Sequence, residues 1–598
     1  MVSVPVPDSA APQGAVPAQS ALTKSQLAGV CLAGLILAFA LCRHFFTLPE
    51  DQFFANHDND GYALRLIEFR DCLASGYLLP QWCSHFRGGL GSPFFNFYQS
   101  GYFYAASLVP SSLPVNWQLG IPLVAFATYG FTSLFCLLRR SCGVEPALVA
   151  AVALLAAPYA HTNLYIRGDL SEFSAMMCIP ACLLALDAWW TRLSLRNVLW
   201  LGGSAAIVVC LHPAIGLVTC GTLLLGVLVK TAADRSLRTL VAGLAGLGTG
   251  AALSAVYWLP LFSHLPLVSA DQAWDGTSFG GFYHYSRHLY SLRCFLGALP
   301  ADLPISVSPG FPALAGAALT VVLLLLRRQQ SLDVLKRHAI GLLMLFAGGL
   351  FLMTPASRWL WDHLPLLDRI QFPWRILTLV SVALAGLVGT AVGQFNSQPV
   401  RRLCTVVLLV FLGMPLVFSR SPKLFPDSYS PNAAMMVDRF FAPDIANEWL
   451  PKGAAPIPLE QVKRDAEVVA CDGECQLSDF ILGQNELTLS VSTTAPATVR
   501  VPHYAFPLGW RATVTDRTRP ESTVPVTLER DTDGLMLLRF DTPVDGMVTV
   551  RWHTTTMKLA GAAVSGISLL AVLLLLWRTR RDRTEPAATV SLQADTNV

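Results

Sequence analysis

Two carboxylates and an arginine stand close to the first hydrophobic stretch of the chain. The segment HDNDGYALR, residues 57–65, carries Asp58, Asp60 and Arg65, and it follows closely on the apolar stretch 26–42. A carboxylate can take a proton from a hydroxyl group. A guanidinium can hold two oxygens of a phosphate at once. These residue types suit a reaction in which a hydroxyl attacks and a phosphate departs, but they do not decide which aspartate would be the base.

Three more candidates lie far along the chain. Arg167 and Glu172 occur in YIRGDLSEF (165–173), and Arg375 ends IQFPWR (370–375). Arg65, Arg167 and Arg375 could face a phosphate. Glu172 could pair with Arg167, as could Asp169, for which a purely structural ion pair is the expected role.

Each candidate also has a plain structural interpretation. Arginines at helix ends often extend their side chains to lipid headgroups. Asp58 or Asp60 could cap the helix that GYALRLIEF predicts. His212 precedes Pro213 at a predicted turn, where we expect an ordinary loop histidine.

The elements that must position these residues are membrane helices. Of the 598 residues 53% are hydrophobic and only 14% are charged, and the mean hydropathy is +0.49. Such values exclude a soluble globular chain. The apolar stretches are about 17 to 25 residues long and lack the alternation of barrel strands. The sequence therefore predicts a mainly α, polytopic helical membrane protein. The net charge of +3 is uninformative about partners, and no basic run suggests nucleic acid.

Basic residues between the apolar stretches set the orientation, because Lys and Arg in short loops stay cytoplasmic. Placing every basic cluster inside gives about twelve helices with both termini in the cytoplasm. The predicted spans are 26–42, 121–138, 146–160, 173–190, 198–212, 214–229, 239–262, 309–326, 339–353, 375–393, 402–418 and 557–577. The segment 98–113 is then expected to lie in the outer membrane interface.

The domain organisation follows from these spans. We expect a disordered cytoplasmic tail (1–24), a transmembrane domain (25–419) with a large first outer loop (43–120), an extracytoplasmic domain (420–556), a last span (557–577) and a basic cytoplasmic tail (578–598). Short period-2 runs such as LTLSVST, WRATVTD and MVTVRW predict an antiparallel β-sandwich in the 420–556 domain.

The ordered set of motifs resembles a known family. DNDGYALRLIEFRDCLASGYLLPQW and RGGLGSPFFNFYQSGYFYAASLV in the first loop, then YIRGDLSEF, IQFPWR, NEWLP and YAFPLGWRATV, resemble the bacterial membrane family called 6-pyruvoyl-tetrahydropterin synthase-related. That family is similar to GT-C glycosyltransferases, which use polyprenyl-phosphate-linked sugars. The chain departs from the family pattern at one place: Tyr62 stands four residues after Asp58, where a histidine is expected.

The resemblance implies a function and a location. It implies a GT-C-like glycosyltransferase of the bacterial inner membrane, active at the periplasmic face, with a polyprenyl-phosphate sugar donor and a glycan, lipid or protein acceptor. Asp58 or Asp60 would be catalytic, and Arg65, Arg167, Glu172 and Arg375 would bind substrate. No metal ligands are assigned; the cofactor is unknown and a divalent metal stays open.

Two sequence features admit simpler roles. RGGLGSP (87–93) lacks the lysine of a phosphate-binding loop, so a tight turn explains it. The aromatic run FFNFYQSGYFY (94–104) is more typical of a membrane-interface belt than of a sugar-stacking platform.

The alternative function is a non-catalytic membrane scaffold or a lipid-linked sugar transporter in envelope polysaccharide assembly. A transporter would show internal repeats and broken helices near mid-membrane. The sequence shows no clear inverted repeat.

Overall fold

The computed structural model describes residues 22–49, 52–270, 281–300, 306–326, 334–419, 422–424, 449–458, 461–462 and 465–584. The side chains of residues 59, 60 and 580–584 lie outside the described part. Asp60 is therefore placed by its backbone alone.

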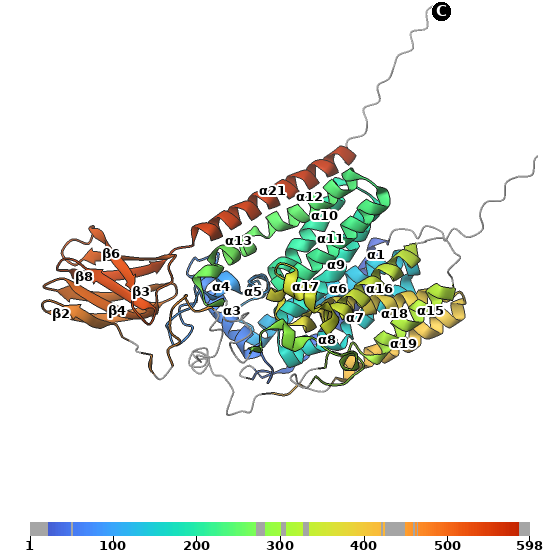
Figure 1. Ribbon diagram of the computed structural model, residues 1–598, viewed down its shortest axis with the longest axis horizontal. Coiled ribbons are helices and arrows are strands. Elements are labelled where there is room, and N and C mark those ends of the chain that lie inside the picture. The colour runs from blue at the N-terminus through green and yellow to red at the C-terminus, as the bar shows by residue number, and fades with distance from the viewer. Residues whose placement is uncertain are drawn as a thin grey trace, which may run out of the picture.

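Helices make up most of the described chain (Figure 1). The α-helices are α1 (Lys24–Cys42), α2 (His44–Thr47), α3 (Asn59–Ala74), α4 (Phe94–Phe97), α5 (Gly101–Ser107), α6 (Val115–Cys142), α7 (Val144–Leu155), α8 (Pro158–His161), α9 (Leu170–Thr191), α10 (Leu195–Leu211), α11 (Pro213–Asp234), α12 (Leu237–Leu253), α13 (Ala255–His264), α14 (Leu292–Phe295), α15 (Phe311–Leu326), α16 (Val334–Leu352), α17 (Arg358–His363), α18 (Leu377–Gly393), α19 (Gln398–Phe418) and α21 (Thr556–Thr584). A π-helix, η1 (Thr162–Arg167), and 3₁₀ turns η2 (Leu265–Leu267), η5 (Tyr285–His288), η6 (Pro355–Ser357), η7 (Asp368–Ile370) and η8 (Pro373–Ile376) complete the set.

The predicted membrane bundle is confirmed. Nine helices of the described chain are long and apolar enough to cross a membrane, and α12 with α13, bent by 71°, would make a tenth span. The shorter apolar helices α10 and α15 coincide with two further predicted spans. The 98–113 segment contains only the seven-residue α5, which is too short to cross.

Small residues let the bundle helices approach closely. A Cβ on Gly130 of α6 would lie 2.6 Å from the carbonyl oxygen of Met177 in α9. A Cβ on Gly389 of α18 would lie 2.7 Å from a carbonyl oxygen in α7. Without a hydrophobic driving force in lipid, such close packing is what holds membrane helices together. α9 and α18, which carry or adjoin candidate residues, are thus central and almost wholly buried.

The C-terminal domain is an antiparallel β structure, as predicted. Its strands are β1 (Glu467–Cys471), β2 (Cys475–Gly483), β3 (Glu486–Thr493), β4 (Ala497–Tyr504), β5 (Trp510–Asp516), β6 (Thr523–Arg530), β7 (Leu535–Phe540) and β8 (Asp545–Trp552). They pair in the order β1-β4-β7-β6-β5-β8-β3-β2. One apolar core joins residues from both halves of the sheet, for example Leu489 and Val550 with Val499 and Leu538. The sheet therefore folds over onto itself around that core.

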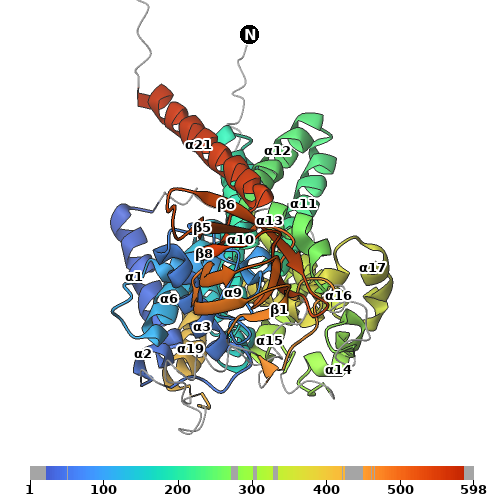
Figure 2. The ribbon, with the colours of Figure 1, turned by 90° about the vertical axis from the view of Figure 1, so that its left-hand side faces the viewer.

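The β domain stands at one end of the bundle, and α21 returns from it along the bundle side (Figure 1). Seen from that end, its strands lie in front of the helical core (Figure 2). The RGGLGSP loop attaches it. A Cβ on Gly91 would lie 2.5 Å from Trp82 and 2.7 Å from His503, so only glycine fits between them. The His503 ring lies 2.6 Å from the carbonyl oxygen of Gly89 and accepts a 2.9 Å hydrogen bond from Trp82. The tight turn that we expected here also serves as a docking contact.

The aromatic run of residues 94–104 does not form the expected membrane-interface belt. Phe94, Phe95, Tyr102 and Phe103 are buried inside the protein, where they pack with Tyr62 and Phe69. The prediction was wrong because composition alone cannot separate rings that face lipid from rings that face a loop core. These rings instead form a wall around the first candidate residues.

Candidate functional site

Asp58 is the N-cap residue of α3, but its side chain makes no capping hydrogen bond there. The residue has φ −134° and ψ −6°, and its carbonyl oxygen accepts the first helical hydrogen bond, from Tyr62. The Asp58 carboxylate therefore does not cap the helix, although capping was the structural interpretation of this residue. Asp58 is half-buried.

A π-helix delivers the second candidate segment. Six residues, 162–167, form η1, which ends at Gly168 with φ +72°. π-helical turns are rare and occur frequently at functional sites. A Cβ on Gly168 would lie 2.5 Å from the side-chain oxygen of Asn56, so glycine permits the first loop to close onto the turn. The Asn56 side chain in turn accepts a 3.3 Å hydrogen bond from the backbone of Asp58.

Arg167 is the centre of a buried ion-pair network. Its guanidinium lies 2.8 Å from Glu172 and 3.3 Å from Asp169, which confirms both expected pairs. It also donates to the side-chain oxygen of Asn163 at 2.8 Å and to the hydroxyl of Tyr159 at 3.0 Å. Tyr159 donates onward to Glu172 at 2.6 Å. A buried charge is tolerated when it is paired in this way.

Arg375 reaches the same carboxylate from another segment. Its Nε lies 3.3 Å from Glu172, and it donates to the carbonyl oxygen of Ile370 at 2.8 Å. Gln371 beside it has φ +64°, a conformation that costs free energy for a residue with a side chain. Such strain gathers at functional sites. The IQFPWR turn thus holds Arg375 against Glu172 at the expense of local backbone strain.

Two tyrosines extend the network to Arg65. The Tyr62 hydroxyl donates to Asp169 at 2.8 Å and accepts from the backbone N–H of Ser171 at 3.1 Å. Tyr98 donates to Tyr62 at 3.2 Å and accepts from Arg65 at 2.9 Å. The Arg65 guanidinium also lies 4.6 Å from the centre of the Tyr98 ring, a cation–π distance. Arg65, Arg167, Glu172 and Arg375 therefore belong to one connected polar cluster.

Asp58 lies in the electrostatic field of this cluster. Burial raises the pKa of Asp58 above its ordinary value, and the negative charge of Asp169 raises it further. The positive charges of Arg65 and Arg167 offset only part of this rise. A carboxylate whose pKa is raised toward neutral pH is a stronger base, and it is better suited to accept a proton from a hydroxyl group.

Asp169 behaves in the opposite way. Burial acts to raise its pKa, but the nearby His212 and the charges of Arg167 and Arg375 outweigh that effect and hold the pKa well below its usual range. It also caps α9 by accepting from the N–H of Glu172 at 3.0 Å. Asp169 therefore stays ionised and holds other groups in place, and its expected structural role stays the better one.

His212 is not the ordinary loop histidine that we expected. It is buried, it caps α11, and its Nε2 lies 3.7 Å from Asp169 and 3.9 Å from Glu172. The sequence prediction failed because a turn between two apolar helices gives no sign of what lies across from it. Tyr62, Tyr98, Tyr159 and Asn163 were missed as well. Only Tyr62 had a signal, its place in the family pattern.

Asp169, Glu172 and His212 offer ligand atoms within 4.8 Å of one another, the spacing of a metal site. Their surroundings do not fit a divalent cation. Arg167 pairs with both carboxylates and Arg375 pairs with Glu172, so two guanidinium charges already balance two carboxylate charges. A dication would add uncompensated charge to a buried cluster. The charges of the cluster are therefore balanced without a metal ion.

Two solved structures are similar to the chain, at low identity and with TM-scores below 0.5. No protein-family model and no curated protein matches the chain. The solved arabinofuranosyltransferase AftD from Mycobacteria is 19% identical with a TM-score of 0.44, over 67% of this chain and 27% of AftD. The oligosaccharyltransferase of Archaeoglobus fulgidus is 14% identical with a TM-score of 0.39, over 69% of this chain and 57% of that one. The chain thus spans about a quarter of the length of AftD. Structural similarity at this level does not establish the function of the chain.

Proposed function

We propose that the chain is a membrane glycosyltransferase that moves a sugar from a polyprenyl-phosphate donor to a glycan, lipid or protein acceptor. We place the reaction at the periplasmic face of the bacterial inner membrane. The observation that supports the proposal is convergence. Arg65, Arg167, Glu172 and Arg375 come from three distant segments and join in one polar cluster, with Asp58 in its electrostatic field.

The roles follow from exposure and charge. Asp58 takes the proton of the acceptor hydroxyl. The hydroxyl oxygen then bonds to the anomeric carbon of the donor sugar, while the bond from that carbon to the phosphate oxygen breaks. The Arg375 side chain is 14% exposed and that of Arg167 only 6%, so Arg375 is better placed to meet the departing phosphate. Arg167 holds Glu172 and, through it, Arg375.

Arg65 is as buried as Arg167, so it acts on the phosphate through its charge and not by direct contact. Three aromatic rings lie within 5.5 Å of its guanidinium, those of Tyr98, Phe94 and Tyr62, and they hold the planar group in place.

One observation favours the transporter alternative. The α12–α13 span is bent by 71°, and broken helices are typical of transporters. Neutral side chains make hydrogen bonds at the bend. Ser565 accepts from the backbone N–H of Val256, Ser254 donates to the carbonyl oxygen of Gly250, and the Trp258 indole donates to the carbonyl oxygen of Ala251. No candidate residue lies there, so the glycosyltransferase remains the proposal.

The test is transfer by purified protein, reconstituted with radiolabelled polyprenyl-phosphate sugars and cell-envelope glycan. Asp58→Asn keeps the size of the side chain and removes the base, and should lower the rate about 100 to 10,000-fold. Asp71→Asn, an exposed position on the same helix, is the matched control. If Asp60→Asn abolishes transfer while Asp58→Asn does not, Asp60 is the base. If neither Asp58→Asn nor Asp60→Asn lowers transfer, neither aspartate is the base. If folded wild-type protein shows no transfer at all, the scaffold or transporter function replaces this proposal.

A further inference from the structure

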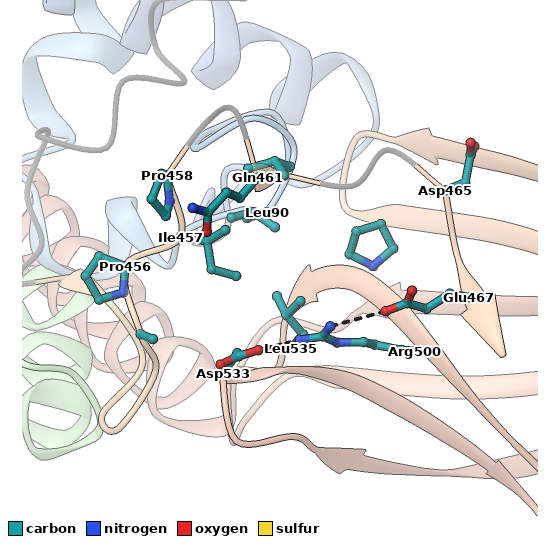
Figure 3. A pocket seen from close by; sticks show the side chains of 13 residues that line it. Leu90, Pro456, Ile457, Pro458, Gln461, Asp465, Glu467, Arg500, Asp533 and Leu535 are labelled. Atoms are coloured by element: carbon teal, nitrogen blue, oxygen red, sulfur yellow. Dashed lines mark hydrogen bonds and ion pairs between the residues drawn. The ribbon is translucent and has the colours of Figure 1, made fainter. Parts of the chain in front are cut away.

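A cavity of about 300 Å³ lies between the β domain and the segment that leads into it (Figure 3). One wall is the end of the sheet, with Glu467, Arg500, Asp533 and Leu535. The other wall consists of residues 455–458 with Gln461 and Val462, and Leu90 of the RGGLGSP loop completes it. None of these residues belongs to the site described above.

The walls are fixed by hydrogen bonds. The backbone of Ala455 donates to the carbonyl oxygen of Asp533 at 3.1 Å and accepts from the hydroxyl of Tyr504 at 2.9 Å. The backbone of Tyr504 donates to the carbonyl oxygen of Leu90 at 2.7 Å. The cavity is therefore preformed and held at a set position relative to the first outer loop, which favours binding.

Arg500 forms the polar floor of the cavity. It lies 2.6 Å from Asp531, 2.6 Å from Asp533 and 3.2 Å from Glu467. Figure 3 shows Asp533 and Glu467 on opposite sides of the guanidinium. The side chains of Asp533 and Glu467 are 47% and 32% exposed, so both still reach solvent in the cavity. Asp531 is largely buried and accepts two backbone N–H groups, so it orients Arg500.

Most of the other lining side chains are apolar. Pro456, Ile457, Pro458, Pro502 and Leu535 lie around this polar floor, together with the polar side chains of Gln461 and Asp465. A sugar ring has apolar C–H faces and hydroxyls at its edge, so it matches such a lining. Carboxylates accept hydrogen bonds from hydroxyls, and hydrogen bonds to a charged group are stronger than neutral ones. The volume is at the lower limit of ligand pockets, which suits a ligand of one or two sugar rings.

Charge narrows the ligand further. The described lining side chains and Asp531 supply four carboxylates and one guanidinium. A ligand with its own carboxylate or phosphate would meet like charge. A neutral sugar or an amine-bearing sugar would not.

We infer that this cavity is a binding subsite for the acceptor, and that the acceptor is a glycan with neutral or amine-bearing sugars at the bound position. The inference rests on the proposed glycosyl transfer, and it assigns the β domain a share in choosing the acceptor. The reaction itself stays at the membrane cluster.

The experiment measures binding without any donor lipid. Purified full-length protein in nanodiscs is titrated with three sugars that share one ring: methyl glucoside, glucosamine and glucuronate, each followed by saturation-transfer NMR. Methyl glucoside and glucosamine should bind, and glucuronate should bind at least about tenfold more weakly, as expected for repulsion by a charged hydrogen-bonding group. Asp533→Asn and Glu467→Gln should weaken the binding of glucosamine by a similar factor.

Asp541→Asn is the matched control, since Asp541 is an exposed carboxylate of the same domain that pairs with Arg539 outside the cavity. Failure of methyl glucoside and glucosamine to bind would overturn the inference, as would equal binding of glucuronate or equal weakening by Asp541→Asn. Transfer is measured in a separate assay that needs the donor lipid, so failure of the proposed glycosyl transfer and failure of this subsite are distinguishable.

Discussion

The hydroxyl of Tyr62 donates a 2.8 Å hydrogen bond to the carboxylate of Asp169, 107 residues away. This contact joins the first outer loop to the helix that carries Glu172. The same hydroxyl accepts from the N–H of Ser171, so one side chain fixes the start of α9. Burial raises the pKa of Tyr62 well above its ordinary value, and it remains a neutral donor at any physiological pH.

Removing that hydroxyl should damage both fold and activity. Tyr62→Phe leaves the N–H of Ser171 and one oxygen of Asp169 without this partner, and an unsatisfied buried group costs about 1 to 3 kcal/mol of stability. Tyr62→His restores a ring donor at the position where the family pattern has histidine. The unfolding temperature and the transfer rate should both be highest in wild type, lower in Tyr62→His and lowest in Tyr62→Phe. Equal values for Tyr62→Phe and wild type would contradict this role of the Tyr62 hydroxyl.

The Arg375–Glu172 contact should show strong coupling. Glu172→Gln leaves two guanidinium groups beside a neutral amide, and breaking a buried pair in this way costs about 3 to 5 kcal/mol. Arg375→Gln alone leaves Glu172 still paired with Arg167, so it should cost less. In the double variant Arg167 and Asp169 remain as a balanced pair, so its loss of unfolding free energy should be smaller than the sum of the two single losses. Additive losses in denaturant unfolding would mean that the two side chains do not interact.

The ionised Asp58 carboxylate should lower the stability of the folded protein, although the proposed reaction requires it. Because its folded pKa is raised, the folded state binds the proton more tightly than the unfolded chain, and stability falls as pH rises through that raised pKa. Asp58→Asn removes this loss, so its unfolding temperature at neutral pH should equal or exceed that of wild type while transfer falls. In wild type the transfer rate should rise over the same pH range. A clearly lower unfolding temperature for Asp58→Asn would indicate a structural role instead.

Acid should loosen the contact between the β domain and the first outer loop. Burial lowers the pKa of His503 from 6.5 to about 4, so the docked state requires the neutral ring that accepts from Trp82. Stability from this contact is complete above pH 6.5 and is lost as pH falls toward 4. Tryptophan fluorescence and limited proteolysis should both report the release. His503→Gln, which cannot be protonated, should remove the pH dependence; an unchanged pH profile in that variant would assign the release to another group.

Orientation can be tested with two cysteine substitutions. His57→Cys lies in the first outer loop and Thr191→Cys at the far end of α9, and both positions are exposed. With intact cells and a membrane-impermeant maleimide, His57→Cys should label above the level of wild type and Thr191→Cys should not. Labelling of Thr191→Cys alone would invert the predicted topology, and with it the place of the reaction.

The sequence predicted the elements better than their contacts. Helix length and hydropathy, together with alternation in the last domain, were enough for the bundle and the β strands, because lipid leaves a spanning segment few alternatives. Arg167, Glu172 and Arg375 could be selected because charges are rare beside membrane helices. Tyr159, Asn163 and His212 could not, since polar neutral residues occur throughout such chains and only the three-dimensional packing shows which of them face Glu172. The buried aromatic run was misassigned for the same reason.

Helix α3 contacts both the polar cluster and the β domain. Tyr62 and Arg65 on its first turns reach the polar cluster, while Glu68 and Cys72 on its later turns accept hydrogen bonds from Gln484 at the β2–β3 turn. With a rise of about 1.5 Å per residue, the ten residues from Tyr62 to Cys72 form a stiff spacer of about 15 Å. Under the proposed function, this stiff helix sets a minimum separation between the polar cluster and the β domain, which an acceptor bound by both would have to span.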